Sequence, residues 1–183
     1  MAHPLQKQTA KRRLSIRKEY QEVNRIRSGF ERSLAFRFIR LFSEIGERTA
    51  TAFDANGTQG ADIVLNRIRP DVESTLISFY REVIQTFTER AVRQRSLKAT
   101  ARGFEEIYAD FINKVGANHI SDIDDTTRKQ VRKVILDNQG AGTQVIGKAI
   151  RERMSPQFTR RRATMIARTE THSAASYATH EQY

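Results

Sequence analysis

The sequence predicts an all-α fold, with a long antiparallel helical hairpin followed by a small bundle of shorter helices. Apolar residues recur with a period of about 3.6 along most of the chain, which is typical of amphipathic helices. No stretch alternates apolar and polar residues for long enough to predict a strand. Glycine and proline positions divide the periodic stretches into separate segments.

The first long segment begins after a short arm. Residues 1–9 include Pro4 and lack an apolar pattern, so we expect a flexible arm there. From residue 10 an apolar stripe predicts one helix, whose second half is the more apolar and should be more deeply buried. Unbroken, this helix would measure about 60 Å, against about 40 Å for a compact chain of this size, so it must bend or project. The stripe comprises Ile16, Tyr20, Val23, Ile26, Phe30, Leu34, Phe38, Leu41 and Ile45, with Phe36, Ile39 and Phe42 beside it.

A second helix is expected to complete the hairpin over residues 10–102. Asn56-Gly57 and Gly60 mark a turn after the first helix, and Pro70 should kink or restart the next one. Because the connection is short, the two helices should pack antiparallel. The start of the first helix and the end of the second are both basic, so this packing would gather positive charge at one end. The second stripe comprises Val64, Ile68, Val72, Leu76, Phe79, Val83 and Phe87.

Residues 103–183 are expected to form the small bundle. A segment opened by Gly103 should end at Gly116 and Asn118, and a helix after the acidic residues 122–125 should end before Gly140 and Gly142. A further helix should run to Ser155-Pro156. The last helix should start at about Thr159, acting as its N-cap, because no Gly or Pro follows as far as Tyr183.

The charge balance is the strongest compositional feature. The 183 residues include 32 Lys and Arg against 21 Asp and Glu, for a formal net charge of +11. Such a balance favours a polyanionic partner, which could be nucleic acid, an anionic surface or an acidic protein. The chain has no Cys, which excludes disulfides and thiolate metal sites and suits an intracellular origin. No apolar run reaches the length of about 20 residues that spans a bilayer, so we expect no membrane association.

Glu170 lies on the predicted buried face of the last helix. This face comprises Ala163, Ile166, Ala167, Ala174, Tyr177 and Ala178. A buried carboxylate needs a cationic or hydrogen-bonding partner, and its own helix offers none one turn away. The partner is therefore expected from another segment, with Arg128, Arg132, Arg151 and Arg153 as candidates. Arg161, Arg168 and His172 recur on the opposite side. A helix with a solvated basic side and a half-exposed Glu170 remains the alternative.

The string Arg-Ala-x-x-Ile-Ala-Arg-Thr-Glu resembles the signature of the minor head, or head-morphogenesis, proteins of tailed bacteriophages (the Mu F-like family). It comprises Arg162, Ala163, Ile166, Ala167, Arg168, Thr169 and Glu170. The short helices expected from Ile120 to Met154 resemble those that precede the signature in that family. Ser176-Tyr177 departs from the family, which usually has Asn there. Many members also continue beyond the point that corresponds to Tyr183.

The resemblance implies a non-enzymatic minor capsid protein that associates with the phage portal protein, with the major capsid protein as a further partner. Several copies around the portal, and non-specific contact with double-stranded DNA during assembly or ejection, are expected. The protein would reside in the virion head, and in the host cytoplasm during assembly. Which part meets portal, capsid or DNA stays open at this point. Candidate polyanion contacts are Lys11, Arg12, Arg13, Arg17, Lys18, Arg93, Arg95, Arg160 and Arg161.

No catalytic, metal or cofactor site is predicted. His119 and Asp122, Asp124 and Asp125 lack the order of a calcium loop, and His172 and His180 lack a zinc-binding arrangement. The glycines at 140, 142 and 147 do not have the spacing of a phosphate-binding loop. Two other functions remain open: a sequence-independent nucleic-acid-binding helical protein, and the N-terminal helical part of a larger enzyme.

Overall fold

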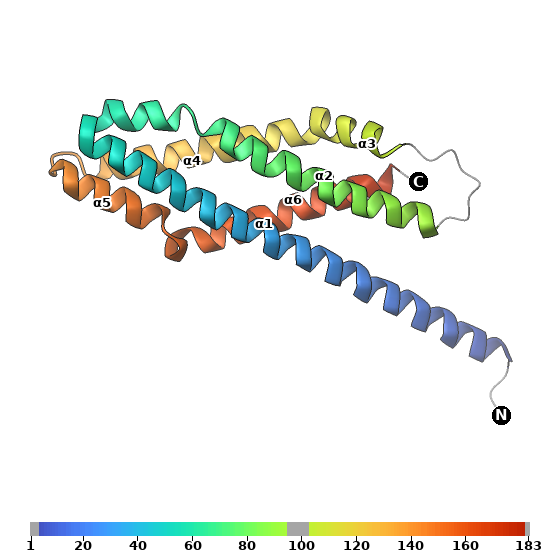
Figure 1. Cartoon of the computed structure of the whole chain (residues 1–183). Coiled ribbons are helices and arrows are strands. Elements are labelled where there is room, and N and C mark those ends of the chain that lie inside the picture. Colours follow the sequence, from blue (N-terminus) through green and yellow to red (C-terminus); the bar gives the residue numbers. More distant parts are fainter. Residues whose placement is uncertain (1–3, 95–102, 182–183) are drawn as a thin grey trace.

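The structure, a computed structural model, is all-α throughout the residues that it describes (Figure 1). These are residues 4–94 and 103–181, with side chains from 15 to 93 and from 103 to 181. The predicted fold class is therefore confirmed. The elements are α1 (Pro4–Leu65), α2 (Arg69–Gln94), α3 (Phe104–Phe111), the π-helical turn η1 (Ile112–Gly116), α4 (Ala117–Asp137), α5 (Thr143–Met154) and α6 (Pro156–His180).

Helix α1 starts earlier than expected and breaks where expected. It begins at Pro4, so residues 4–9 of the expected flexible arm are helical. At the other end Asn56 and Gly57 leave helical geometry, and Gly57 has a φ of 57°, a conformation that favours glycine. Gly60, which follows this break, lies so close to the preceding part of α1 that an added Cβ would be 2.1 Å from the Ala52 carbonyl oxygen. The chain reverses direction at this point, and α2 restarts with Pro70 in its first turn (Figure 1).

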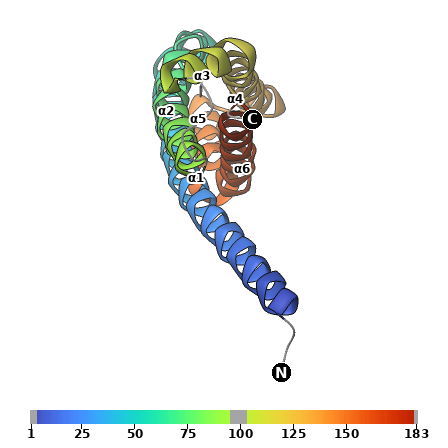
Figure 2. The ribbon, with the colours of Figure 1, turned by 90° about the vertical axis from the view of Figure 1, so that its right-hand side faces the viewer.

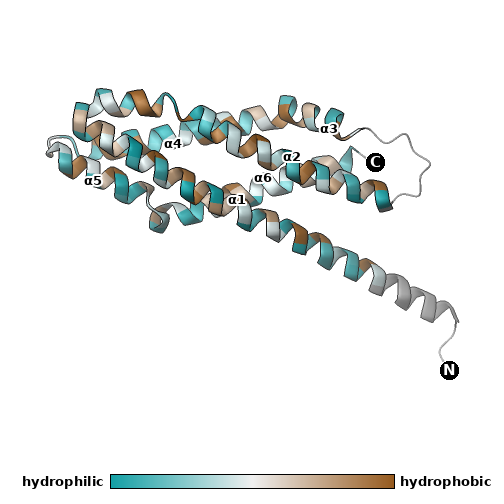
Figure 3. Ribbon diagram, viewed as in Figure 1, coloured by the Kyte–Doolittle hydropathy of each residue, from teal (hydrophilic) through white to brown (hydrophobic). Residues whose placement is uncertain are grey.

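The hairpin and the bundle share one hydrophobic core. Helices α1 and α2 run antiparallel as predicted, and ion pairs Arg48–Asp71 and Arg37–Glu82 join them. The core, however, continues from Leu34 of α1 to Ala178 of α6 without a division near residue 102. Helix α1 packs mainly against α5 and α6, because a stripe this wide cannot be covered by α2 alone. Hydrophobic residues accordingly recur along the helices instead of forming one block (Figure 3).

Two glycines bring α5 close to α1. An added Cβ at Gly46 would lie 2.5 Å from the Met154 Cβ, and one at Gly147 would lie 2.2 Å from an Asp54 carboxylate oxygen. Arg151 of α5 closes this contact by pairing with both Glu47 and Asp54 of α1. The α1–α5 interface is thus a close backbone approach flanked by ion pairs.

Helices α3 and α4 form one continuous element, so the expected end at Gly116 and Asn118 is wrong. The π-helical turn η1 joins them, and Gly116 lies within it. A Cβ on Gly116 would lie 3.3 Å from the Tyr80 ring, so this glycine provides room for an aromatic neighbour and does not end a helix. The other predicted breaks are confirmed: residues 138–142 form a turn in which Gly140 has a φ of 91°, and Ser155 separates α5 from α6.

Helix α6 begins at Pro156, three residues before the expected start. Ser155 occupies the N-cap position, and proline suits the first turn because its missing N–H would have no helical acceptor there. The Thr159 hydroxyl instead donates to the Ser155 carbonyl oxygen at 2.9 Å. Thr159 is therefore inside the helix and is not its N-cap.

The first part of α1 projects from the bundle (Figures 1 and 2). Helix α6 runs antiparallel to α1: Arg168 lies beside Glu31, and His172, one turn later, lies beside Arg27. Helix α2 ends four residues after Arg90, which pairs with Glu22, and α6 ends eight residues after His172, which contacts Arg27. The described parts of both helices therefore end near residues 18–20 of α1. Residues 4 to 20, here called the arm, therefore extend for about 25 Å beyond them, at 1.5 Å per residue. The prediction that this helix must bend or project is confirmed.

None of the described helices is long and apolar enough to cross a membrane.

Candidate functional site

The signature residues of α6 divide between the core and the surface. Ala163 and Ala167 are fully buried, so their small side chains allow α6 to lie close to its neighbours. Arg162 and Ile166 are partly buried, and Arg168 and Thr169 are exposed. Glu170 is only 4% exposed, which confirms the predicted burial and excludes the half-exposed alternative.

The Glu170 carboxylate is bound from two other helices. Its Oε2 accepts a hydrogen bond of 2.6 Å from the Tyr80 hydroxyl of α2 and lies 2.7 Å from Nδ1 of His119 on α4. A carboxylate that accepts two close donors at one oxygen is compensated for much of its loss of hydration. Glu170 therefore joins α6 to both α2 and α4.

The predicted arginine partners of Glu170 are wrong. Arg128 pairs with Asp124 one turn away, Arg132 pairs with Asp62, and Arg151 pairs with Glu47 and Asp54. Arg153 is exposed and makes no described contact with Glu170. Each paired arginine thus has a carboxylate close to its own position. The hydrogen-bond partners of Glu170 are instead a tyrosine and a histidine.

Tyr80 is held in place by a chain of aromatic rings. It is fully buried, and its ring centroid lies 4.9 Å from that of Phe111, which in turn lies 5.3 Å from that of Tyr177. Both contacts are edge-to-face, the arrangement that aromatic quadrupoles favour. Burial raises the pKa of Tyr80, and the Glu170 carboxylate raises it further. The hydroxyl is therefore protonated over the whole physiological range and serves as a donor.

His119 reaches Glu170 from the first turn of α4. The π-helical turn η1 ends three residues earlier, and such turns add a residue that shifts the following side chains around the helix. The hydrogen bond to Glu170 raises the pKa of His119, while partial burial acts in the opposite direction. The net direction is upward, so the imidazolium form is favoured and its Nδ1–H donates to Glu170.

Arg162, which is partly buried, is a second residue that joins α6 to other helices, and its hydrogen-bond acceptors are uncharged. Its guanidinium donates to Gln130 Oε1 at 3.1 Å, to the Thr127 hydroxyl at 2.9 Å and to the Ile123 carbonyl oxygen at 3.2 Å, all on α4. Its other side stacks on the Phe42 ring of α1, with the guanidinium carbon 4.6 Å from the ring centroid. Burial lowers the pKa of Arg162 to about 10, with a smaller contribution from Arg153. The side chain stays charged at neutral pH.

The candidate polyanion residues do not form one surface. Arg17 and Lys18 are exposed on the arm, whereas Arg160 and Arg161 are exposed near the start of α6. From the α1–α6 register these two pairs are about 30 Å apart along α1. Arg93 is near the end of α2 and pairs with Glu89. Lys11, Arg12 and Arg13 belong to the helical arm, but their side chains, like Arg95 as a whole, lie outside the described residues.

The surface of α6 predicted to be cationic is partly neutralised. Arg168 lies 3.9 Å from Glu31, which offsets its charge, whereas His172 is hydrogen-bonded to the Arg27 guanidinium, which offsets none. Arg161 remains exposed, and no carboxylate among the described residues pairs with it. The basic surface of α6 is therefore concentrated at its first turns.

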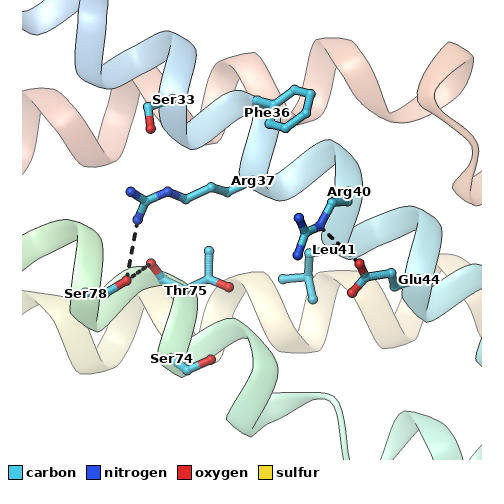
Figure 4. Close-up of a pocket in the computed structure, with 9 residues that line it drawn as sticks. All are labelled: Ser33, Phe36, Arg37, Arg40, Leu41, Glu44, Ser74, Thr75 and Ser78. Atoms are coloured by element: carbon cyan, nitrogen blue, oxygen red, sulfur yellow. Dashed lines mark hydrogen bonds and ion pairs between the residues drawn. The ribbon is translucent and has the colours of Figure 1, made fainter.

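A groove of about 550 Å³ lies between α1 and α2, lined among others by Phe36, Arg37, Arg40 and Ser78 (Figure 4). Arg37 is held across it by Glu82, and the Ser78 hydroxyl donates to the Thr75 carbonyl oxygen. The polar groups of the groove thus bind one another. Phe36 is 68% exposed at its edge, although it was expected to widen the buried apolar surface beside the stripe.

The Glu170 cluster joins three helices. It consists of a carboxylate, a histidine and a protonated tyrosine that lies among aromatic rings, and each of the three groups comes from a different helix. Among the described side chains, no group of three or more His, Asp or Glu residues could hold a metal. Sequence reasoning missed Tyr80, although its spacing from Leu76 and Ile84 places it on the buried face. It also considered His119 only as a metal ligand.

The chain matches no known protein-family model, no curated protein and no solved structure.

Proposed function

We propose that this chain is a non-enzymatic minor capsid protein of a tailed phage, which associates with the portal protein and contacts DNA during assembly or ejection. The observation that carries the proposal is the signature from Arg162 to Glu170. Its two most buried charged groups, Glu170 and Arg162, bind three other helices. Signature residues that hold helices together are expected of a structural protein.

The shape of the molecule supports an adaptor role. A packed bundle carries the signature, and the arm projects from it with exposed Arg17 and Lys18 (Figure 2). Arg160 and Arg161 form a second exposed basic patch, away from the arm. Two separate basic surfaces allow one molecule to meet a DNA phosphate backbone at one place and a protein at another.

The proposal is tested by mass spectrometry of purified proheads and virions from the phage that encodes this chain. We expect the chain in both, at a fixed ratio to portal subunits, and in the same gradient fractions as portal rings after co-expression. Because the hairpin and bundle share one core, the full chain is used and not a truncated one. Absence from both particles, together with migration apart from portal rings, would contradict the proposal.

A sequence-independent nucleic-acid-binding protein is the second candidate, and the exposed Arg160 and Arg161 favour it. It predicts duplex DNA binding that weakens steeply with salt, since each neutralised phosphate releases counterions. It also predicts no fixed ratio to any structural subunit. The particle analysis above therefore separates the two candidates.

A further inference from the structure

The arm continues the buried stripe of α1 beyond the helices that cover it. Val23 packs against the core, and Tyr20 and Ile16 follow on the same face at the helical spacings of three and seven residues. Tyr20 is 67% exposed and Ile16 is 58% exposed. The apolar helix face therefore continues into solvent, with Tyr20 beside the described ends of α2 and α6 and Ile16 past them.

A hollow of about 350 Å³ lies at the base of the arm, where α1, α2 and α6 meet. Val23, Phe87 and Ala175 contribute its apolar lining, and Arg27 and His180 line it as well. Since Val23 belongs to the same stripe as Ile16 and Tyr20, the hollow and the stripe form one continuous surface, here called the arm surface. It offers an apolar strip that ends in a recess, the form that helix-in-groove recognition uses.

The charges around the arm surface select its partner. Arg17 and Glu19 flank the strip, Arg27 lines the hollow, and the preceding sequence adds Lys7, Lys11, Arg12 and Arg13, with no acidic residue before Glu19. A second copy of the arm would place these cations against one another, which is unfavourable. Duplex DNA would meet the cations but has no use for an exposed apolar strip. An acidic amphipathic helix satisfies both the strip and the charge.

We propose that the arm surface docks an acidic amphipathic helix of a protein partner, which lies along Ile16 and Tyr20 and inserts one apolar side chain into the hollow. This inference rests on the proposed function only in its choice of a structural protein as the natural partner. The partner helix would continue the packing that α2 and α6 provide along the rest of α1. Charge would speed the encounter, and the apolar strip would hold the complex together.

The test uses the full-length protein and a fluorescent synthetic peptide, as long as the arm, with Leu on one helical face and Glu elsewhere. We expect saturable binding that weakens at least about tenfold in the double variant Ile16→Ser/Tyr20→Ser, since both side chains lose their buried contact. The matched control is Phe36→Ser, because Phe36 is an equally exposed apolar residue of α1 outside the arm. It should change the affinity less than about twofold.

Three further measurements complete the test. A peptide of the same composition in shuffled order should bind at least about tenfold more weakly, because it has no continuous apolar face. Duplex DNA should bind Ile16→Ser/Tyr20→Ser and wild type alike. Sedimentation of the protein alone should show no self-association that depends on these two residues.

The inference is overturned if the ordered peptide does not bind, if the shuffled peptide binds equally, if the double variant binds peptide as wild type does, or if DNA binding or self-association requires Ile16 and Tyr20. Both side chains are exposed, so the variants should retain the wild-type melting temperature. Co-migration with portal rings is measured separately. Failure of the wild-type protein to bind the ordered peptide, with intact co-migration, would reject the arm surface and leave the proposed function standing.

Discussion

The substitution Glu170→Ala is expected to lower the free energy of unfolding by about 3 kcal/mol at neutral pH. It removes the acceptor of the Tyr80 hydroxyl and of His119 Nδ1, and both groups would lose their partner inside the protein. Removing one member of a buried, hydrogen-bonded set costs more than the set contributes, because the fully buried Tyr80 hydroxyl cannot return to water. Urea unfolding monitored by circular dichroism measures the change.

Two controls separate the Glu170 contacts from a general effect of losing a carboxylate. Glu170→Gln keeps the shape and one acceptor oxygen, so we expect about half the loss. Glu89→Ala removes an exposed carboxylate that pairs with Arg93 one turn away, and it should cost less than about 1 kcal/mol. Equal losses in Glu170→Ala and Glu89→Ala would show that Glu170 is solvated.

The substitution Arg162→Ala is expected to lower the free energy of unfolding by about 2–4 kcal/mol. It leaves the Thr127 hydroxyl, the Ile123 carbonyl and the Gln130 amide without their shared donor, and it removes the contact over Phe42. Arg162→Lys should recover less than half of the loss, because one ammonium cannot match the planar fork that reaches three acceptors and stacks on a ring. Thermal and urea unfolding measure both variants.

Arg161→Ala is the matched control for Arg162, since it removes an exposed arginine from the adjacent position. We expect a change below about 0.5 kcal/mol, as for other surface substitutions. If Arg161→Ala and Arg162→Ala were equally mild, the guanidinium of Arg162 would not be part of the core. Full recovery by Arg162→Lys would mean that charge alone matters at this position.

The burial of Glu170 could be predicted because it depends on spacing along one helix. Residues at 163, 167, 170, 174 and 178 share a face whatever that face contacts, and the structure buries all five. The identity of its partners depends instead on which helices meet there. Tyr80 and His119 are 90 and 51 residues away in sequence, and no local pattern links them to Glu170.

The search for an arginine partner went wrong for a physical reason. A cationic or hydrogen-bonding partner was expected, but only arginines were considered as candidates, whereas a tyrosine hydroxyl and a histidine both donate to one oxygen of Glu170. For Arg128 the competing partner could be predicted from the sequence, because Asp124 lies one turn before it on the same helix. For Arg132 and Arg151 the competing carboxylates come from α1 and become visible only in the fold.

The helical hairpin could be predicted from two apolar stripes and a turn. The other helices that pack against it could not be predicted. A stripe shows that a helix face is buried but does not identify the helix that covers it. The structure covers α1 mainly with α5 and α6, which joins the expected hairpin and bundle into one core. Gly116 shows the same limit, since a glycine that accommodates the Tyr80 ring looks in sequence like one that ends a helix.

The contact between Glu170 and His119 also makes stability depend on pH. The pKa of His119 is raised above its ordinary value, mainly by the hydrogen bond to Glu170. The folded protein therefore holds this proton more tightly than the unfolded chain does. The resulting stabilisation is fully present below the unfolded pKa of about 6.5 and is lost as the pH rises through the raised value, although neutral His119 can still donate through Nδ1.

Titration of His119 by NMR tests most directly whether the last helix is attached through Glu170. The imidazole signals are followed from acidic to alkaline pH, assigned with His119→Gln, and compared between wild type and Glu170→Gln. We expect the pKa of His119 to lie above that of an exposed histidine in wild type and to fall in Glu170→Gln. An ordinary pKa that is the same in both proteins would show that His119 and Glu170 do not meet, and would contradict this description of the signature helix.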